Sequence, residues 1–156
     1  MSKYLQPKSE IVVMTLQHVQ PIVAESLAQW HKMIEHKETS ILVELLHREV
    51  VFRSPMAHRP YAGAFAVGLI LQTVITIFEN FTYHRSFATD DGMEIVLEFS
   101  AVVDGKSLKG IDMIRFNQEG KIIDFEVMIR PFNALAALGK AMGERVAGQV
   151  AAHKVG

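Results

Sequence analysis

The fold of this chain is decided by the stretch GIDMIRFNQEGKI, residues 110–122. Its centre, Asn117-Gln118-Glu119-Gly120, is a turn signal between two segments rich in β-branched and aromatic residues, which predicts a hairpin of antiparallel strands. We expect these strands near Ser107–Phe116 and Lys121–Arg130. Because alternate residues of a strand face opposite sides, Asp112 shares one face with a row of apolar or small residues. These are Leu108, Gly110, Ile114 and Phe116.

Two further turn signals precede this hairpin, Asp90-Asp91-Gly92 and Asp104-Gly105. They bound strands expected near Phe81–Thr89 and Met93–Val103, so the second half of the chain is predicted to form a meander of four antiparallel strands. Pro131 ends the last strand. Beyond it, apolar residues at helical spacing predict a terminal helix. They are Leu135, Leu138, Met142, Val146 and Val150.

The first half of the chain has mainly helical patterns. A helix is expected from Pro21, since proline suits the first turn of a helix, and a second, short helix is expected over Ile41–Leu46. Val50-Val51-Phe52 predicts a strand, Met56–Gly63 a loop and Ala64–Phe78 a third helix. Helices followed by an antiparallel sheet indicate the α+β class.

The length of 156 residues fits one domain. We expect an N-terminal arm at 1–20, a main domain at 21–131 and a C-terminal helical extension at 132–156. The net charge of -1 argues against broad nucleic-acid binding, which needs a basic excess. The chain has no cysteine, which excludes disulfides and thiolate nucleophiles and fits a cytoplasmic protein.

A membrane location is not expected. The first residues, Met1-Ser2-Lys3-Tyr4-Leu5-Gln6-Pro7, lack the charged head and apolar core of a signal peptide. The longest apolar stretch, 64–78, is interrupted by polar residues and is shorter than the roughly 20 residues that a membrane span needs. We therefore expect a cytoplasmic protein.

Two carboxylates on the predicted hairpin are the first candidates for chemistry. Asp112 lies in a row of apolar residues, so it is either a buried group or part of an exposed strand edge. The alternation of residues along the strand favours neither of these two interpretations. Glu126 lies on the polar side of the next strand, which alone would face solvent. A loop with Gly120 left-handed would place Glu126 opposite Asp112, and two carboxylates that close raise one pKa. A register slip of one residue destroys this argument.

Metal and cofactor sites are not expected. The seven histidines lie on separate elements or off a common helical face, and no HExxH pattern occurs. Gly105-Lys106-Ser107 lacks the upstream glycine of a phosphate loop, and no glycine-rich dinucleotide fingerprint or nucleophile elbow is present.

Residues 110–122, together with Val51-Phe52-Arg53-Ser54-Pro55 and the Pro60-Tyr61-Ala62-Gly63 turn, resemble the nuclear transport factor 2-like superfamily, the group of ketosteroid isomerases and SnoaL-like polyketide cyclases. The resemblance spans roughly residues 27–131. It implies a cone formed by helices and a strongly curved antiparallel sheet, with an internal pocket. Function does not follow from the fold alone, since one fold hosts many reactions.

The resemblance also implies which sheet face lines the pocket. The concave face is expected to carry Asp112, Ile114, Glu126, Met128 and Arg130, with Leu97, Phe99 and Ala101. The outer face is expected to carry Phe125, Val127 and Ile129. Since an exposed apolar sheet face demands a cover, this assignment predicts a homodimer through the outer face.

Compared with ketosteroid isomerase, this chain keeps one of three catalytic groups. Asp112 matches the oxyanion aspartate, which ketosteroid isomerase keeps neutral so that it can donate a hydrogen bond. Trp30 replaces the oxyanion tyrosine and offers an N–H donor. Ser54 replaces the general base, and serine removes no proton from carbon without a stronger base beside it. Ketosteroid isomerisation is therefore not expected.

The predicted ligand is a small apolar or oxygenated molecule. Apolar contact is expected from Trp30, Phe52, Phe99, Ile114 and Met128, and polar contact from Ser54, Asp112 and Glu126. Near the mouth, His58 and Tyr61 would clamp a polar end, or else are solvated loop residues. Arg130 would hold an anionic group, or else pair with Glu126 or point into water. The chain is then either an acid–base enzyme of the isomerase, cyclase or hydratase type, with Asp112 moving the proton, or a non-catalytic ligand-binding or dimerisation module.

Overall fold

The computed structural model describes residues 18–154 and has the predicted α+β architecture. Most of the expected N-terminal arm at 1–20 lies outside the described residues. The helices are α2 (Pro21–His36), the 3-10 turn η1 (Thr39–Ile41), α3 (Leu42–Leu45), α4 (Ala64–Ile77) and α5 (Phe132–Lys154). The strands are β1 (Leu46–Arg53), β2 (Tyr61–Ala62), β3 (Glu79–Ala88), β4 (Glu94–Val103), β5 (Lys106–Phe116) and β6 (Ile122–Arg130).

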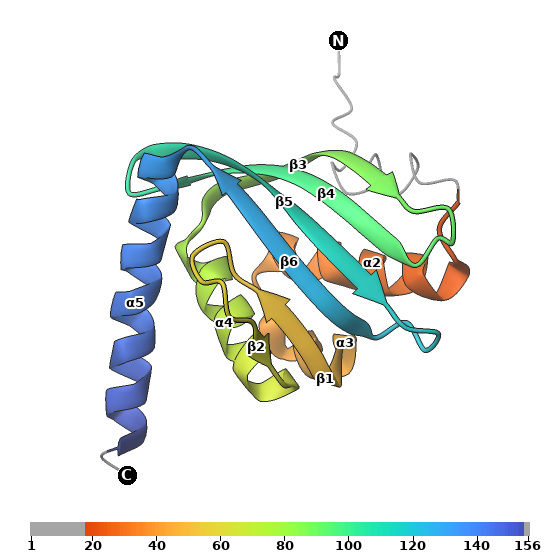
Figure 1. Ribbon diagram of the computed structural model, residues 1–156, viewed down its shortest axis with the longest axis horizontal. Helices are drawn as coiled ribbons and strands as arrows, with labels where there is room; N and C mark the ends of the chain where they lie inside the picture. The colour runs from red at the N-terminus through yellow and green to blue at the C-terminus, as the bar shows by residue number, and fades with distance from the viewer. Residues whose placement is uncertain (1–17, 155–156) are drawn as a thin grey trace.

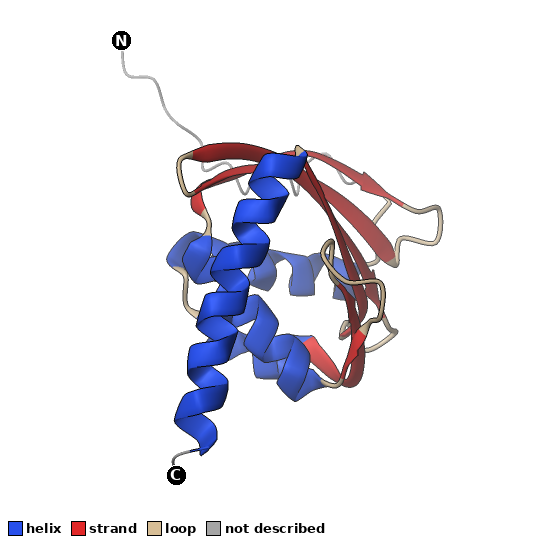
Figure 2. Cartoon of the chain, turned by 60° about the vertical axis from the view of Figure 1, so that its left-hand side comes forward, coloured by secondary structure: helices blue, strands red, loops and turns tan. Residues whose placement is uncertain are grey.

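The six strands form one sheet with the order β2-β1-β6-β5-β4-β3. The four-strand meander is confirmed, and β1 joins its free edge by pairing parallel to β6. The expected loop at 56–63 contains the short strand β2, which pairs with β1. The sheet curls around α2, α3 and α4, while α5 crosses the open end of the resulting cone (Figure 1; Figure 2).

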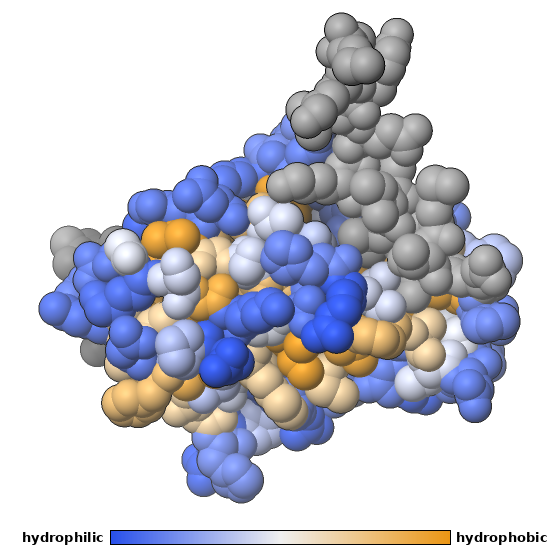
Figure 3. Space-filling model, turned by 90° about the horizontal axis from the view of Figure 1, so that it is seen from above, coloured by the Kyte–Doolittle hydropathy of each residue, from blue (hydrophilic) through white to orange (hydrophobic). Residues whose placement is uncertain are grey.

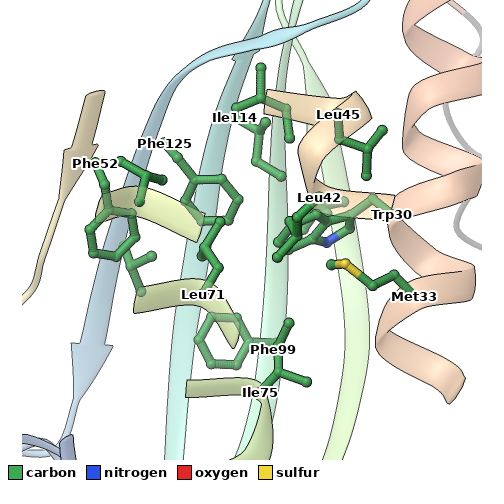
Figure 4. Packing of buried hydrophobic residues seen from close by; sticks show 14 of the residues in the cluster. Trp30, Met33, Leu42, Leu45, Phe52, Leu71, Ile75, Phe99, Ile114 and Phe125 are labelled. Carbon is green, nitrogen blue, oxygen red and sulfur yellow. The ribbon is translucent and has the colours of Figure 1, made fainter. Parts of the chain in front are cut away.

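The hydrophobic core lies on the concave side of the sheet. In α2, proline occupies the first turn, and the buried residues Val23, Leu27, Trp30 and Met33 recur at helical spacing. Phe125 of β6 packs between the rings of Phe52 and Trp30, at centroid distances of 5.8 and 5.2 Å (Figure 4). Phe125 therefore points into the molecule, toward the helices.

The predicted faces of β6 are wrong, and a β-bulge is the reason. The hairpin starts in the expected register, with Phe116 opposite Ile122, but the next pair is Arg115 with Asp124. Ile123 is thus an extra residue in β6, and such a residue reverses the side to which every later side chain points. Asp112 consequently faces Val127 and not Glu126.

The reversal moves Phe125, Val127 and Ile129 from the outer to the inner face of the sheet. The outer face instead carries ion pairs: Arg53 Nη2 lies 3.1 Å from Asp124 Oδ2, and Glu98 binds Arg85. Seen from above, the surface shows hydrophobic residues set among hydrophilic ones (Figure 3). The argument for a homodimer through an exposed Phe125–Ile129 face therefore does not hold, and the homodimer stays a prediction.

No helix in the described part of the chain is long and apolar enough to cross a membrane.

Candidate active site

A cavity of about 340 Å³ lies between the concave face of the sheet and helices α2, α4 and α5. Its wall is mostly aromatic and aliphatic, and the aromatic members are Trp30, Phe52, Tyr61, Phe78, Phe81, Tyr83, Phe99 and Phe125. Four lining residues are exposed to solvent and therefore mark the mouth: Lys37, Met56, Tyr61 and Gly143. A concave apolar site with a few polar groups is the usual form of a small-molecule site.

One carboxyl group, Asp112, lies in this apolar wall. Its side chain projects from the middle of β5, and the residue is only 6% exposed. The Tyr83 hydroxyl on β3 donates a hydrogen bond of 2.9 Å to Asp112 Oδ2, and Trp30 Nε1 on α2 donates one of 2.9 Å to the Tyr83 oxygen. Three elements distant in sequence thus build one chain of hydrogen bonds that ends at the cavity wall.

The direction of this chain is fixed by its first member. An indole nitrogen is a donor only, so the Tyr83 oxygen accepts from Trp30 and its single hydrogen goes to Asp112. Successive donors polarise one another. Asp112 Oδ2 is therefore committed to Tyr83, whereas Oδ1 makes no hydrogen bond to the side chains and backbone described over residues 18–147. A molecule in the cavity would meet Oδ1.

Burial raises the pKa of Asp112 to about 7, although the hydrogen bond from Tyr83 opposes the shift. Removal from water disfavours the charged form of a carboxyl group, and here this effect exceeds the stabilisation that one donor gives. Burial likewise raises the pKa of Tyr83 well above its ordinary value. Near neutral pH, Asp112 is thus available both as an acid and as a base, while Tyr83 keeps its proton.

Several residues expected from the sequence line the cavity: Trp30, Phe52, Ser54, Tyr61, Phe99 and Asp112. Ser54 Oγ accepts a hydrogen bond of 3.0 Å from the backbone N–H of Met56. Ile114 is fully buried on the same face of β5 as Asp112 but packs in the core and does not line the cavity.

Four further expected site residues do not line the cavity. Glu126, Met128 and Arg130 were assigned to the concave face, but the bulge at Ile123 turns them to the outer face, where Glu126 Oε2 lies 4.0 Å from Arg53 Nε and Met128 is 49% exposed. His58 is an exposed loop residue. The predicted Asp112–Glu126 pair therefore does not form.

Sequence reasoning missed Tyr83 and the contribution of α5. Tyr83 lies opposite Phe99 in the β3–β4 ladder, but the register shifts between Tyr83 and Ser86, so the alternation of residues along β3 does not by itself show which face Tyr83 takes. The cavity-lining residues of α5 include Leu138, Met142 and Val146, which the helical spacing had already grouped on one face. Nothing in the sequence alone showed that this face meets the cavity.

His31, next to Trp30 on α2, is a second buried titratable group. It is 4% exposed, its Nε2 has no hydrogen-bond partner among the described residues, and its ring packs edge-on against Tyr83 at a centroid distance of 5.1 Å. Burial lowers the pKa of His31 to about 4. The imidazole is therefore neutral in the folded protein at neutral pH.

The His31→Leu variant is expected to lose less stability in acid than the wild type. As the pH falls from 6.5 to about 4, an unfolded histidine takes up a proton that buried His31 refuses, so His31 destabilises the folded state by up to about 3 kcal/mol across this window. Urea unfolding at pH 7 and pH 4.5 measures the difference. Replacement of the exposed His36 by leucine is the control, and an equal acid loss in wild type and His31→Leu would contradict the assignment.

Within residues 18–154, no group of three histidine, aspartate or glutamate side chains is placed to hold a metal ion.

This chain shares its fold and much of its sequence with a solved structure. No family model matches the chain, and no curated protein matches it. Among solved structures, a steroid delta-isomerase from Pseudomonas aeruginosa is 55% identical, with a TM-score of 0.83, and the match covers 85% of this chain and 97% of that one.

Two more distant structures share the fold alone. An NTF-2 like protein of unknown function from Burkholderia xenovorans LB400 is 13% identical, with a TM-score of 0.60, over 71% of this chain and 85% of that one. A putative SnoaL-like polyketide cyclase from Shewanella denitrificans OS-217 is 14% identical, with a TM-score of 0.57, over 78% of this chain and 99% of that one.

Proposed function

This chain belongs to the nuclear transport factor 2-like superfamily, and from that premise we propose that it is a cofactor-independent acid–base enzyme. In this proposal, Asp112 moves a proton on a small, largely apolar molecule that carries a carbonyl or hydroxyl group. The observation that carries the proposal is a buried carboxyl group with one uncommitted oxygen in the wall of an otherwise apolar cavity. The name of the 55% identical neighbour, a steroid delta-isomerase, supports the same class of chemistry.

The proposed step is an allylic proton shift in a β,γ-unsaturated ketone. Charged Asp112 removes a proton from the carbon next to the carbonyl through Oδ1, so a C–H bond breaks, an O–H bond forms and the electron pair moves onto the carbonyl oxygen as a dienolate. The same oxygen returns the proton to the γ-carbon, and the conjugated ketone forms. A pKa of about 7 for Asp112 suits both halves of this exchange.

Ser54 is proposed as a donor to the ligand oxygen, because its Oγ accepts from Met56 and its own hydrogen is not used in the contacts found. Trp30 is not proposed in that role, since its N–H binds Tyr83. Steroid isomerisation, the activity in the name of the Pseudomonas neighbour, is a hypothesis for this chain. The position expected to hold the general base carries Ser54, so Asp112 would have to act alone.

The test uses two β,γ-unsaturated ketones, one steroidal and one monocyclic, incubated with the protein in deuterium oxide. We expect ultraviolet absorbance to report the conjugated product, and we expect mass spectrometry to find most of that product free of deuterium, because Asp112 returns the proton that it removed. General acid–base catalysis contributes about 10²–10⁴-fold, and Asp112→Asn should lose an acceleration of this order. The matched control is Asp104→Asn, an exposed turn residue.

The alternative is a non-catalytic binding module, which the replacement of the general base by Ser54 favours. Binding of both ketones with neither isomerisation nor deuterium uptake would support this module and contradict the enzyme. Turnover that survives in Asp112→Asn would contradict the role of Asp112.

A further inference from the structure

The C-terminal helix supplies the outer wall of the cavity. Five residues of α5 line it: Leu138, Gly139, Met142, Gly143 and Val146. They recur as one side of the helix, and α5 crosses the open end of the cone that the other elements form (Figure 2). Ser54 and Asp112, which are proposed to meet the polar end of the ligand, line the same cavity as these α5 residues.

The two glycines on this side of α5 differ in what surrounds them. A Cβ atom at Gly139 would lie 2.4 Å from Cε of Met56, so the Met56 side chain already fills that notch. A Cβ atom at Gly143, one turn later, would meet no atom within 4 Å. Gly143 is exposed and lines the cavity, so its notch is an open part of the mouth.

No contact among the described residues requires glycine at position 143. In a helix interior, glycine is the least favourable residue apart from proline, and close packing explains Gly139 but not Gly143. The absence of a side chain at 143 has one visible effect, which is to leave the mouth of the cavity open beside α5.

The backbone around Gly143 is held in place. Arg145 Nη1 donates a hydrogen bond of 2.7 Å to Thr76 Oγ1 on α4. Earlier in α5, Ala134 is fully buried and Leu138 is 3% exposed. A side chain introduced at 143 would therefore project from a fixed helix into the open space beside it.

We propose that Gly143 determines the length of ligand that the protein accepts. The ligand class is an elongated apolar molecule whose oxygen-bearing end lies at Ser54 and Asp112 and whose tail passes α5 through the gap at Gly143. The inference rests on the proposed function, since it needs the cavity to bind a ligand with its polar end at these two residues.

The test measures the affinity of methyl ketones with tails of increasing length, from 2-hexanone to 2-dodecanone. Trp30 is the one tryptophan of the chain and lines the cavity, so its fluorescence reports binding. In the wild type, affinity should rise about four-fold for each added methylene that leaves water. In Gly143→Leu, the rise should stop about two methylenes earlier, with affinity for the shortest ketones unchanged.

Three companion variants make the result specific. Ala136→Leu adds the same side chain at an exposed position of α5 that does not line the cavity, and it should behave as the wild type. Met142→Ala removes volume from the wall and should extend the tolerated length. Gly143→Ala should give a smaller effect than Gly143→Leu, and it replaces that variant in the test if the leucine prevents folding.

Each contrary outcome has its own meaning. Binding of no ketone by the wild type would contradict the proposed function and this inference together. Length-dependent binding that is identical in wild type and Gly143→Leu would overturn the inference alone. An equal loss for short and long ketones would also overturn it, because a blocked gap should spare short tails.

Discussion

Replacement of Asp112 by asparagine is expected to stabilise the protein at alkaline pH. The pKa of Asp112 is about 7 in the folded state, against 3.8 for an ordinary aspartate. The folded state therefore holds a proton that the unfolded state has lost between these pH values, and stability falls as the pH rises through the window. Above pH 7, the buried charge of Asp112 lowers the free energy of unfolding by up to about 4 kcal/mol.

Asparagine resembles the neutral acid in shape and still accepts the hydrogen bond from Tyr83, but it has no charge to bury. In urea unfolding, Asp112→Asn should be more stable than the wild type by about 1–2 kcal/mol at pH 5, where an unfolded aspartate is already ionised, and by about 4 kcal/mol at pH 9. Asp104→Asn, at an exposed turn, should show no such difference. A stability change that is the same at both pH values would show that Asp112 is ionised normally in the folded protein.

Combined with loss of turnover, this gain would separate a functional role of Asp112 from a structural one. A residue kept for stability destabilises the protein when it is replaced. A charged group held in an apolar wall at a cost to stability is typical of a functional site.

Replacement of Gly110 by alanine is expected to destabilise the protein by about 1–3 kcal/mol, the range for overpacking a filled core. A Cβ atom at Gly110 would lie 2.7 Å from the backbone oxygen of Met128 and 2.6 Å from Cζ of Phe99. The carbonyl is part of the β5–β6 ladder, and Phe99 stacks on Phe81 at a centroid distance of 5.0 Å. Neither neighbour can move without disturbing the sheet or the cavity wall.

The control for this variant is Gly68→Ala on α4. There the nearest atom to a new Cβ is Cδ1 of Leu46, at an ordinary 3.8 Å, and alanine in place of glycine favours a helix by up to about 1 kcal/mol. The two substitutions add the same methyl group to buried glycines and should change the free energy of unfolding in opposite directions. If Gly110→Ala unfolds at the wild-type urea concentration, the close approach of β6 to Gly110 is wrong.

The sequence predicted the helices and strands, and it predicted that Asp112 shares a strand face with apolar residues. Turn signals located the four strands of the meander, and the alternation in β5 placed Asp112 on the same face as Ile114, which is buried. These features depend on near neighbours in the chain, where periodicity is informative.

The rest depends on contacts that local patterns do not contain. The predicted faces of β6 were wrong because Ile123 has no partner in β5. In the sequence, the alternation of Asp124 with Phe125 looks the same with or without such a bulge. Tyr83 reaches Asp112 only through the β3–β4–β5 register, and α5 reaches the cavity only once the whole cone is closed. Predicting either requires the strand order and the curvature of the sheet.

The single extra residue at Ile123 has an evolutionary consequence. Deleting one residue from this hairpin would turn the remainder of β6 inside out, so that Glu126 entered the hollow and Val127 left it, with almost no change in amino-acid content. In a homologue that lacks this one residue, the cavity wall contributed by β6 would be acidic where it is apolar in this chain. Insertions and deletions, more than substitutions, are therefore the events that would rewrite the reaction of this scaffold.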